Sequence, residues 1–168
     1  MSVLEFGLKS FFRPRIYEIT RDNAPAGTIE CSRMWERATI AIDDANYAAA
    51  REGKVSGAFY LETNGNRVAT AEKSSGRLFT VQIGDRTLTL KAASAFGRSF
   101  ILTEHGVQIG AIAPLGWLMR KWRAELPADL APGVQAFVIW LVLILWRRAA
   151  AAVQFTSSIN TTTMIASS

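Results

Sequence analysis

The chain has 168 residues, of which 49% are hydrophobic and 20% charged, with a formal net charge of +5. This mixture excludes a disordered chain and favours one globular domain. A mild basic excess is compatible with nucleic acid, with anionic lipid or with no charged partner. Cys31 is the only cysteine, and the N-terminal residues lack the apolar stretch and cleavage site of a signal peptide. We therefore expect a cytoplasmic protein without an intramolecular disulfide.

Three segments of the chain align without gaps and form a repeat. They are ITRDNAPAGTI, LETNGNRVATA and LTEHGVQIGAI, at residues 19–29, 61–71 and 102–112. Each has a polar turn, centred on Asn23, Gly65 and Gly106, and the spacing is 42 and then 41 residues. A fixed period of this size indicates a repeated supersecondary unit.

Each aligned segment is predicted to be a β-hairpin. Asn64-Gly65 is a strong two-residue hairpin signal, because a type I′ turn needs positive φ at both central positions. His105-Gly106 is a weaker version of the same signal. The first copy is expected to have a longer loop, with Pro25 and Gly27.

A second hairpin is predicted within each unit. Residues 79–83 and 87–90 alternate apolar and polar side chains on either side of Gly84-Asp85, which is typical of a half-buried antiparallel hairpin. In the first unit, residues 38–42 precede a turn and a weaker return strand at residues 47–50. The third unit is shortened, with one expected strand within residues 117–125. The whole pattern predicts about ten to twelve short strands, closed into an antiparallel barrel that has no exposed edges.

The segment QAFVIWLVLILW, at residues 135–146, has no polar face after Gln135. A helix that is apolar all round must be buried in a protein core or in lipid. Residues 136–146 span about 16 Å as a helix, which is short for a bilayer core of about 30 Å. A barrel of a dozen strands has an interior that its own side chains do not fill. We therefore predict a central helix at about residues 133–148 inside a single domain at residues 1–153, followed by a flexible tail at residues 154–168.

A membrane anchor is the alternative interpretation of the same segment. Residues 130–146 form a stretch of 17 residues, although Pro132, Gly133 and Gln135 interrupt its apolar character. Arg147-Arg148 then complements the C-terminal dipole of a helix, and the same pair is also a stop-transfer pattern. In this alternative the protein is a single-span membrane-associated protein.

The hairpin repeat followed by an apolar helix resembles the Tubby C-terminal-like superfamily, which includes the LURP-one-related proteins and the phospholipid scramblases. The resemblance covers about residues 11–150 and implies a twelve-stranded barrel around a central helix. Tubby-like members bind phosphoinositides through basic surface residues, and scramblases are associated with a calcium-binding acidic segment. Neither site can be matched to this chain residue by residue. No acidic run resembles the calcium-binding segment, since Asp43-Asp44 is only a pair of acidic residues in a turn.

The sequence contains no catalytic constellation. His105, the only histidine, lies in a predicted turn, where His, Asn and Asp tolerate positive φ. One cysteine and one histidine cannot form a closed zinc site, and nothing places Cys31 beside His105 as a nucleophile pair. The GxSxG, P-loop and GxGxxG motifs do not occur. We therefore expect no enzymatic activity, no metal site and no cofactor.

The best candidate site is the basic aromatic cluster WLMRKWR at residues 117–123. Basic residues are attracted to anionic head groups, and tryptophan favours apolar–polar boundaries. The lipid-binding candidates are Arg120, Lys121, Trp122 and Arg123. The same alternation is also what an ordinary strand with its aromatic face in the core would show. Lys9, Arg13 and Arg15, near Phe11 and Phe12, form a second stretch with the same two interpretations.

These observations predict a non-catalytic, cytoplasmic binding module at the periphery of a membrane. Its expected partner is an anionic phospholipid surface or another protein, and no nucleic-acid partner is expected. The alternatives are the single-span protein described above and a structural or ligand-carrying barrel.

Overall fold

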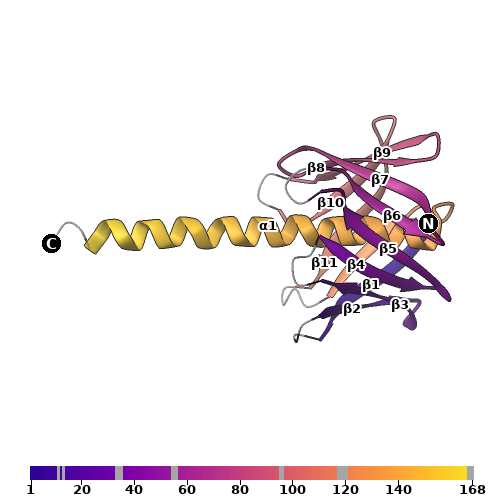
Figure 1. Ribbon diagram of the computed structural model, residues 1–168, viewed down its shortest axis with the longest axis horizontal. Coiled ribbons are helices and arrows are strands. Elements are labelled where there is room, and N and C mark those ends of the chain that lie inside the picture. Colours follow the sequence, from indigo (N-terminus) through magenta and orange to yellow (C-terminus); the bar gives the residue numbers. More distant parts are fainter. Residues whose placement is uncertain are drawn as a thin grey trace.

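The computed structural model describes residues 1–10, 12, 14–32, 36–53, 57–94, 97–116 and 121–165, with side chains described as far as residue 151. It forms a β-barrel and one long helix (Figure 1). The strands are β1 (Ser2–Ser10), β2 (Arg15–Arg21), β3 (Ala24–Cys31), β4 (Arg37–Ile42), β5 (Ala45–Arg51), β6 (Phe59–Thr63), β7 (Asn66–Ser75), β8 (Leu78–Ile83), β9 (Arg86–Ala92), β10 (Phe100–Glu104), β11 (Val107–Leu115) and β12 (Lys121–Leu126), and the helix is α1 (Pro132–Ile165).

The strands form one closed antiparallel barrel. Each strand pairs with its neighbours in the sequence, and β12 pairs with β1 to close the sheet. Closure gives each of the twelve described strands a neighbour on both sides, which removes a site of unwanted strand addition. The predicted fold class, a closed antiparallel barrel of about ten to twelve strands around a hydrophobic helix, is confirmed.

The sequence repeat corresponds to a unit of four strands. The first unit is β2–β5 and the second is β6–β9. In all three units the first hairpin has its register shift at the same aligned position, between Ile19/Thr20, Leu61/Glu62 and Leu102/Thr103. The third unit, β10–β12, lacks a fourth strand in sequence order. The N-terminal strand β1 takes that place, because it pairs with β12 on one side and with β2 on the other.

The aligned hairpins share one turn geometry. The two central residues have φ of 51° and 63° at Asp22-Asn23, 50° and 76° at Asn64-Gly65, and 49° and 82° at His105-Gly106. These are the positive values that a type I′ hairpin requires. The prediction of a longer loop in the first copy was wrong, because β3 begins at Ala24. Pro25 lies in the strand opposite Thr20, beside the register shift, where a missing N–H is tolerated.

The barrel encloses the apolar part of α1. No side chain from residue 134 to residue 145 is more than 3% exposed. Pro132–Ala151 is long and apolar enough to cross a membrane, but 67% of the window is buried in the barrel. This burial is expected of the core helix of a barrel too wide for its own side chains to fill.

Specific contacts fix the start of α1 in the barrel. The Gln135 side-chain nitrogen donates hydrogen bonds to the backbone carbonyls of Pro127, at 2.9 Å, and Leu130, at 3.1 Å. Gly133 lies so close to the ring of Tyr47 that a Cβ at this position would overlap it. The glycine therefore allows the first turn of the helix to pass the ring.

The helix continues well beyond the predicted boundary at about residue 148. It runs to Ile165, so most of the segment predicted as a flexible tail is helical, and it projects from the barrel (Figure 1). We call residues 149–165 the α1 extension. Its helical form was not predicted because the Ser- and Thr-rich sequence has no helical period.

The two ends of the barrel differ. Because β12 ends at Leu126, shortly before α1 begins, the helix starts at the end that holds the hairpin turns at residues 22–23, 43–44, 64–65, 84–85 and 105–106. We call this the turn end. The helix leaves the barrel at the opposite end, where β1 ends and β2 begins, and we call this the exit end (Figure 1).

Candidate functional site at the exit end

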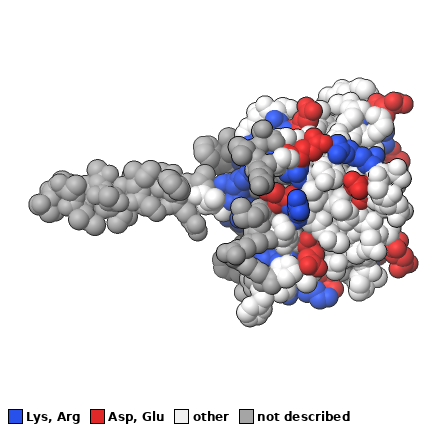
Figure 2. Space-filling model, viewed as in Figure 1, with Lys and Arg blue, Asp and Glu red and all other residues white. Residues whose placement is uncertain are grey.

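Basic side chains gather at the exit end. We assign to each end its connections and the two flanking residues of each strand. On this definition the described acidic residues of the exit end are Glu30, Glu36 and Glu52. The described basic residues are Lys9, Arg15, Arg37, Arg51, Arg77, Lys91, Arg98 and Lys121, together with Arg147 and Arg148 where α1 emerges. Figure 2 shows the positive side chains close to the emerging helix.

The turn end has the opposite charge. Its described basic residues are Arg21, Arg67 and Arg86. Arg21 pairs with Asp43 and Arg86 pairs with Glu104 at this end, whereas the Arg67 side chain reaches Glu52 of the exit end. Its described acidic residues are Asp22, Asp43, Asp44, Glu62, Asp85, Glu104, Glu125 and Asp129. The barrel is therefore electrostatically polarised along its axis, with the positive end around the emerging helix.

Aromatic rings hold several of the exit-end arginines. The guanidinium carbons of Arg51 and Arg148 lie 5.8 Å and 5.7 Å from the centre of the Phe59 ring. The guanidinium carbon of Arg77 lies 5.4 Å from the Phe100 ring centre. Phe59 and Phe100 occupy aligned positions of the repeat, and both are at most 1% exposed. Cation–π contacts of this kind orient the arginines and leave their charge in place.

One carboxylate serves two of these arginines. Glu36 Oε1 lies 2.9 Å from Arg51 Nη1 and 3.8 Å from Arg148 Nη2. Burial and the adjacent Arg51 guanidinium lower the pKa of Arg148. The lowered pKa means that Arg148 carries its positive charge at an energetic cost, and an approaching anion would reduce that cost.

The predicted cluster at residues 117–123 lies partly within the described chain. Arg120 is outside the described residues. Lys121 and Arg123 lie on the outer face of β12, and Arg123 Nη2 pairs with Glu5 Oε1 at 3.1 Å. Trp122 lies on the inner face, with its ring centre 5.6 Å from Phe6. The structure thus places Trp122, which is partly buried, against the core, as the alternative strand interpretation predicts.

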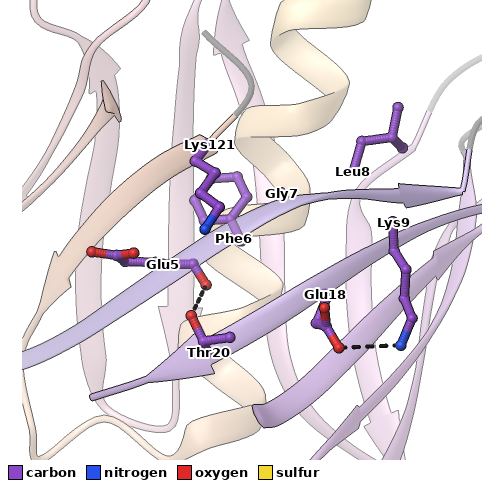
Figure 3. Close-up of a pocket in the computed structure, with 8 residues that line it drawn as sticks. All are labelled: Glu5, Phe6, Gly7, Leu8, Lys9, Glu18, Thr20 and Lys121. Carbon is purple, nitrogen blue, oxygen red and sulfur yellow. Dashed lines mark hydrogen bonds and ion pairs between the residues drawn. The ribbon is translucent and has the colours of Figure 1, made fainter. Parts of the chain in front are cut away.

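Lys121 lies beside a shallow hollow of about 230 Å³ on the outer surface of β1, β2 and β12. Gly7 forms part of its floor, and Lys121 projects from one side (Figure 3). On the other side Lys9 Nζ pairs with Glu18 Oε1 at 3.1 Å (Figure 3). Within the described part of the chain, no ion pair joins Lys121 to a carboxylate. Its charge adds to the positive potential of the exit end.

The second predicted stretch also lies at the exit end, between β1 and β2. Phe11 and Arg13 are outside the described residues. Phe12 is 86% exposed, the largest exposed fraction among the described large hydrophobic residues. Arg15 is exposed at the start of β2. An exposed aromatic ring therefore lies among the basic residues.

The two residues considered for nucleophilic chemistry are far apart in the fold. Cys31 ends β3 at the exit end, whereas His105 lies in the β10–β11 turn at the turn end. They cannot form a Cys–His pair in this barrel. No group of three His, Cys, Asp or Glu residues within the described ranges is placed to hold a metal ion.

Cys31 and Tyr17 form a buried titratable pair near the helix exit. Burial raises the pKa of Tyr17 to about 12, and electrostatic repulsion from Cys31 contributes to this rise. Burial also raises the pKa of Cys31 to about 12, against the lowering effects of Arg15 and Arg147. Both groups are therefore neutral in the folded protein at physiological pH.

We expect alkaline pH to destabilise the protein through this pair. The unfolded Cys31 thiol ionises near pH 9 and the folded thiol near pH 12. The unfolded state therefore binds fewer protons in this window, and the free energy of unfolding falls as pH rises from 9 to 12. Urea unfolding across this range should show a shallower fall for Cys31→Val than for the wild-type chain. Identical slopes would show that the thiol is not buried.

Comparisons of the chain with protein-family models, with curated proteins and with solved structures found no match. The resemblance to the Tubby C-terminal-like superfamily therefore stays a prediction. The class that the fold defines is a twelve-stranded antiparallel barrel with a central helix.

Sequence reasoning identified basic clusters but missed their common location. In an up-and-down barrel alternate connections lie at the same end. The connections that contain Asp22, Asp43-Asp44 and Asp85 alternate with segments that contain Arg15, Arg51 and Arg98. Charge alternation between successive connections was therefore the sequence signal of the polarised barrel.

Proposed function

We propose that the protein is a non-catalytic binding module that docks its exit end onto an anionic phospholipid membrane. The observation that supports this function is the segregation of charge, with the basic end surrounding the emerging helix. Each Lys or Arg near an anionic membrane surface contributes about 1 kcal/mol of attraction. The acidic turn end is repelled by the same surface, so polarisation also fixes the orientation of the barrel.

The single-span alternative conflicts with the packing of α1. Residues 134–145 fill the barrel and are at most 3% exposed. Moving them into a bilayer would empty the interior of a twelve-stranded barrel, which its own side chains cannot fill. This is the reason for proposing peripheral docking with a folded barrel, on the cytoplasmic side of a membrane where anionic lipids are concentrated.

Vesicle flotation tests the proposed function. We expect the full chain to float with vesicles of phosphatidylcholine and phosphatidylserine and to remain unbound with phosphatidylcholine alone. Salt that is present before the protein and vesicles are mixed should weaken the first electrostatic capture of the barrel, because the Debye length falls from about 8 Å at 0.15 M to about 3 Å at 1 M. Equal binding to both kinds of vesicle, or binding to neither, would contradict the proposed function.

A further inference from the structure

The α1 extension emerges from within the basic end and continues away from the barrel (Figure 1). A flat membrane therefore cannot meet this end unless the helix bends aside or enters the lipid. Residues 149–165 continue α1 without a break after Arg148. At the usual rise, this part of the helix is about 25 Å long, which is close to the thickness of the apolar core of a bilayer, about 30 Å.

The composition of the α1 extension permits transfer into lipid, because its only strongly polar side chains are the amides of Gln154 and Asn160. No charged residue occurs from Ala149 to Ser168, and Arg147-Arg148 precedes this stretch directly. An isolated helix of this length is marginal in water, and Thr and Ser are weak helix formers. A partner surface would stabilise the helical form.

Phe12 supplies an independent observation at the same end. Its side chain is 86% exposed, and it lies between Lys9 and Arg15 in sequence. An exposed aromatic residue flanked by basic residues is suited to the membrane interface, where its ring enters lipid and the cations contact head groups.

We infer that docking inserts the α1 extension into the bilayer and seats Phe12 in the interface beside it. This inference rests on the proposed function and names its mode of attachment. Electrostatic attraction brings the exit end to the membrane, and apolar contact then retains it. The central part of α1 stays in the barrel, so the inserted segment differs from residues 130–146.

Truncation separates the inserted helix from the charged end. A chain that stops after Arg148 keeps every described strand and all the basic residues of the exit end. We expect the full chain to stay on phosphatidylserine-containing vesicles at high salt and the truncated chain to be released. Circular dichroism checks that the truncated barrel is folded. Equal salt resistance of the two chains would overturn the inference and leave the proposed function standing.

A fluorescent label reports insertion directly. Cys31 is 1% exposed, so an environment-sensitive thiol label on Ser158→Cys is selective for the α1 extension in the folded protein. We expect a blue shift of its emission on phosphatidylserine-containing vesicles and quenching by lipids with brominated acyl chains. Vesicle-bound protein with unshifted, unquenched emission would show that the helix stays outside the lipid.

Phe12 has a matched control at the opposite end of the barrel. Val107 is also a large exposed hydrophobic residue, at 66%, and begins β11 at the turn end. We expect Phe12→Ser to weaken vesicle affinity on the order of tenfold and Val107→Ser to leave it unchanged. Equal vesicle affinities of Phe12→Ser and the wild-type chain would show that Phe12 does not contact the membrane interface. If no variant and no wild-type chain responds to phosphatidylserine, the proposed function itself fails.

Discussion

Replacing Trp140 with alanine is expected to lower the free energy of unfolding by about 3–5 kcal/mol. The side chain is fully buried, and its ring centre lies 5.7 Å from that of Phe59 and 5.8 Å from that of Phe137. It links the central helix to the barrel wall, so its removal leaves a cavity that a closed sheet cannot readily fill by moving inward. Urea denaturation followed by circular dichroism measures the loss.

A more conservative change at the same position separates packing from polarity. Among the described atoms, the Trp140 indole nitrogen has no hydrogen-bond partner. A buried donor without a partner costs about 1–3 kcal/mol, and Trp140→Phe removes it. We therefore expect Trp140→Phe to be less destabilising than Trp140→Ala.

The control for this prediction is Phe12→Ala, which truncates an aromatic residue that is 86% exposed. Its free energy of unfolding should match that of the wild-type chain. A Trp140→Ala variant as stable as Phe12→Ala would contradict the enclosure of α1 by the barrel.

Neutralising three exit-end residues should weaken affinity for phosphatidylserine-containing vesicles on the order of 100-fold, at about 1 kcal/mol for each residue. Suitable changes are Arg37→Gln, Lys91→Gln and Lys121→Gln, because these side chains are exposed at strand ends. They point outward from three different parts of the sheet, so the barrel core is untouched. Vesicle titration of the triple variant measures the effect.

A matched triple variant removes the same net charge at the turn end. The changes Asn46→Asp, Asn66→Asp and Gln108→Glu act on exposed residues there. If only net charge mattered, the two triple variants would lose equal affinity. We expect the turn-end variant to bind nearly as well as the wild-type chain, since the added charges lie far from the docked surface compared with the Debye length. Equal losses would contradict a localised docking end.

Much of the fold followed from local patterns in the sequence. Asn64-Gly65 and His105-Gly106 located their hairpins because positive φ restricts the residues a tight turn accepts. The apolar segment at residues 135–146 was predicted to lie inside the barrel, because the side chains of a barrel of this size do not fill its interior. Both inferences depend on constraints that act within a few residues or on the strand count alone.

Other features depend on pairing between distant segments. The role of β1 was not predicted, because it completes the third repeat unit from the opposite end of the chain. Pro25 suggested a longer loop, but tertiary pairing placed it in β3. The inward position of Trp122 required the register of β12, in which Lys121 and Arg123 face outward.

The candidate site was predicted only in part for the same reason. Lys121 and Arg15 were identified as basic residues near aromatic residues, but their shared end became evident only from the strand order. The contribution of Arg51 and Arg148, which meet at Phe59, was not predicted at all. Those residues are far apart in the sequence, and no local pattern joins them.

The orientation of the bound barrel tests the central claim most directly. Hydrogen exchange of the full chain can be measured with and without phosphatidylserine-containing vesicles. We predict slower exchange in exit-end connections such as residues 76–77 and 97–99, with unchanged exchange in the turns at residues 22–23, 64–65 and 105–106. Vesicle-bound protein that is protected at the turn end, or protected at neither end, would contradict docking through the exit end.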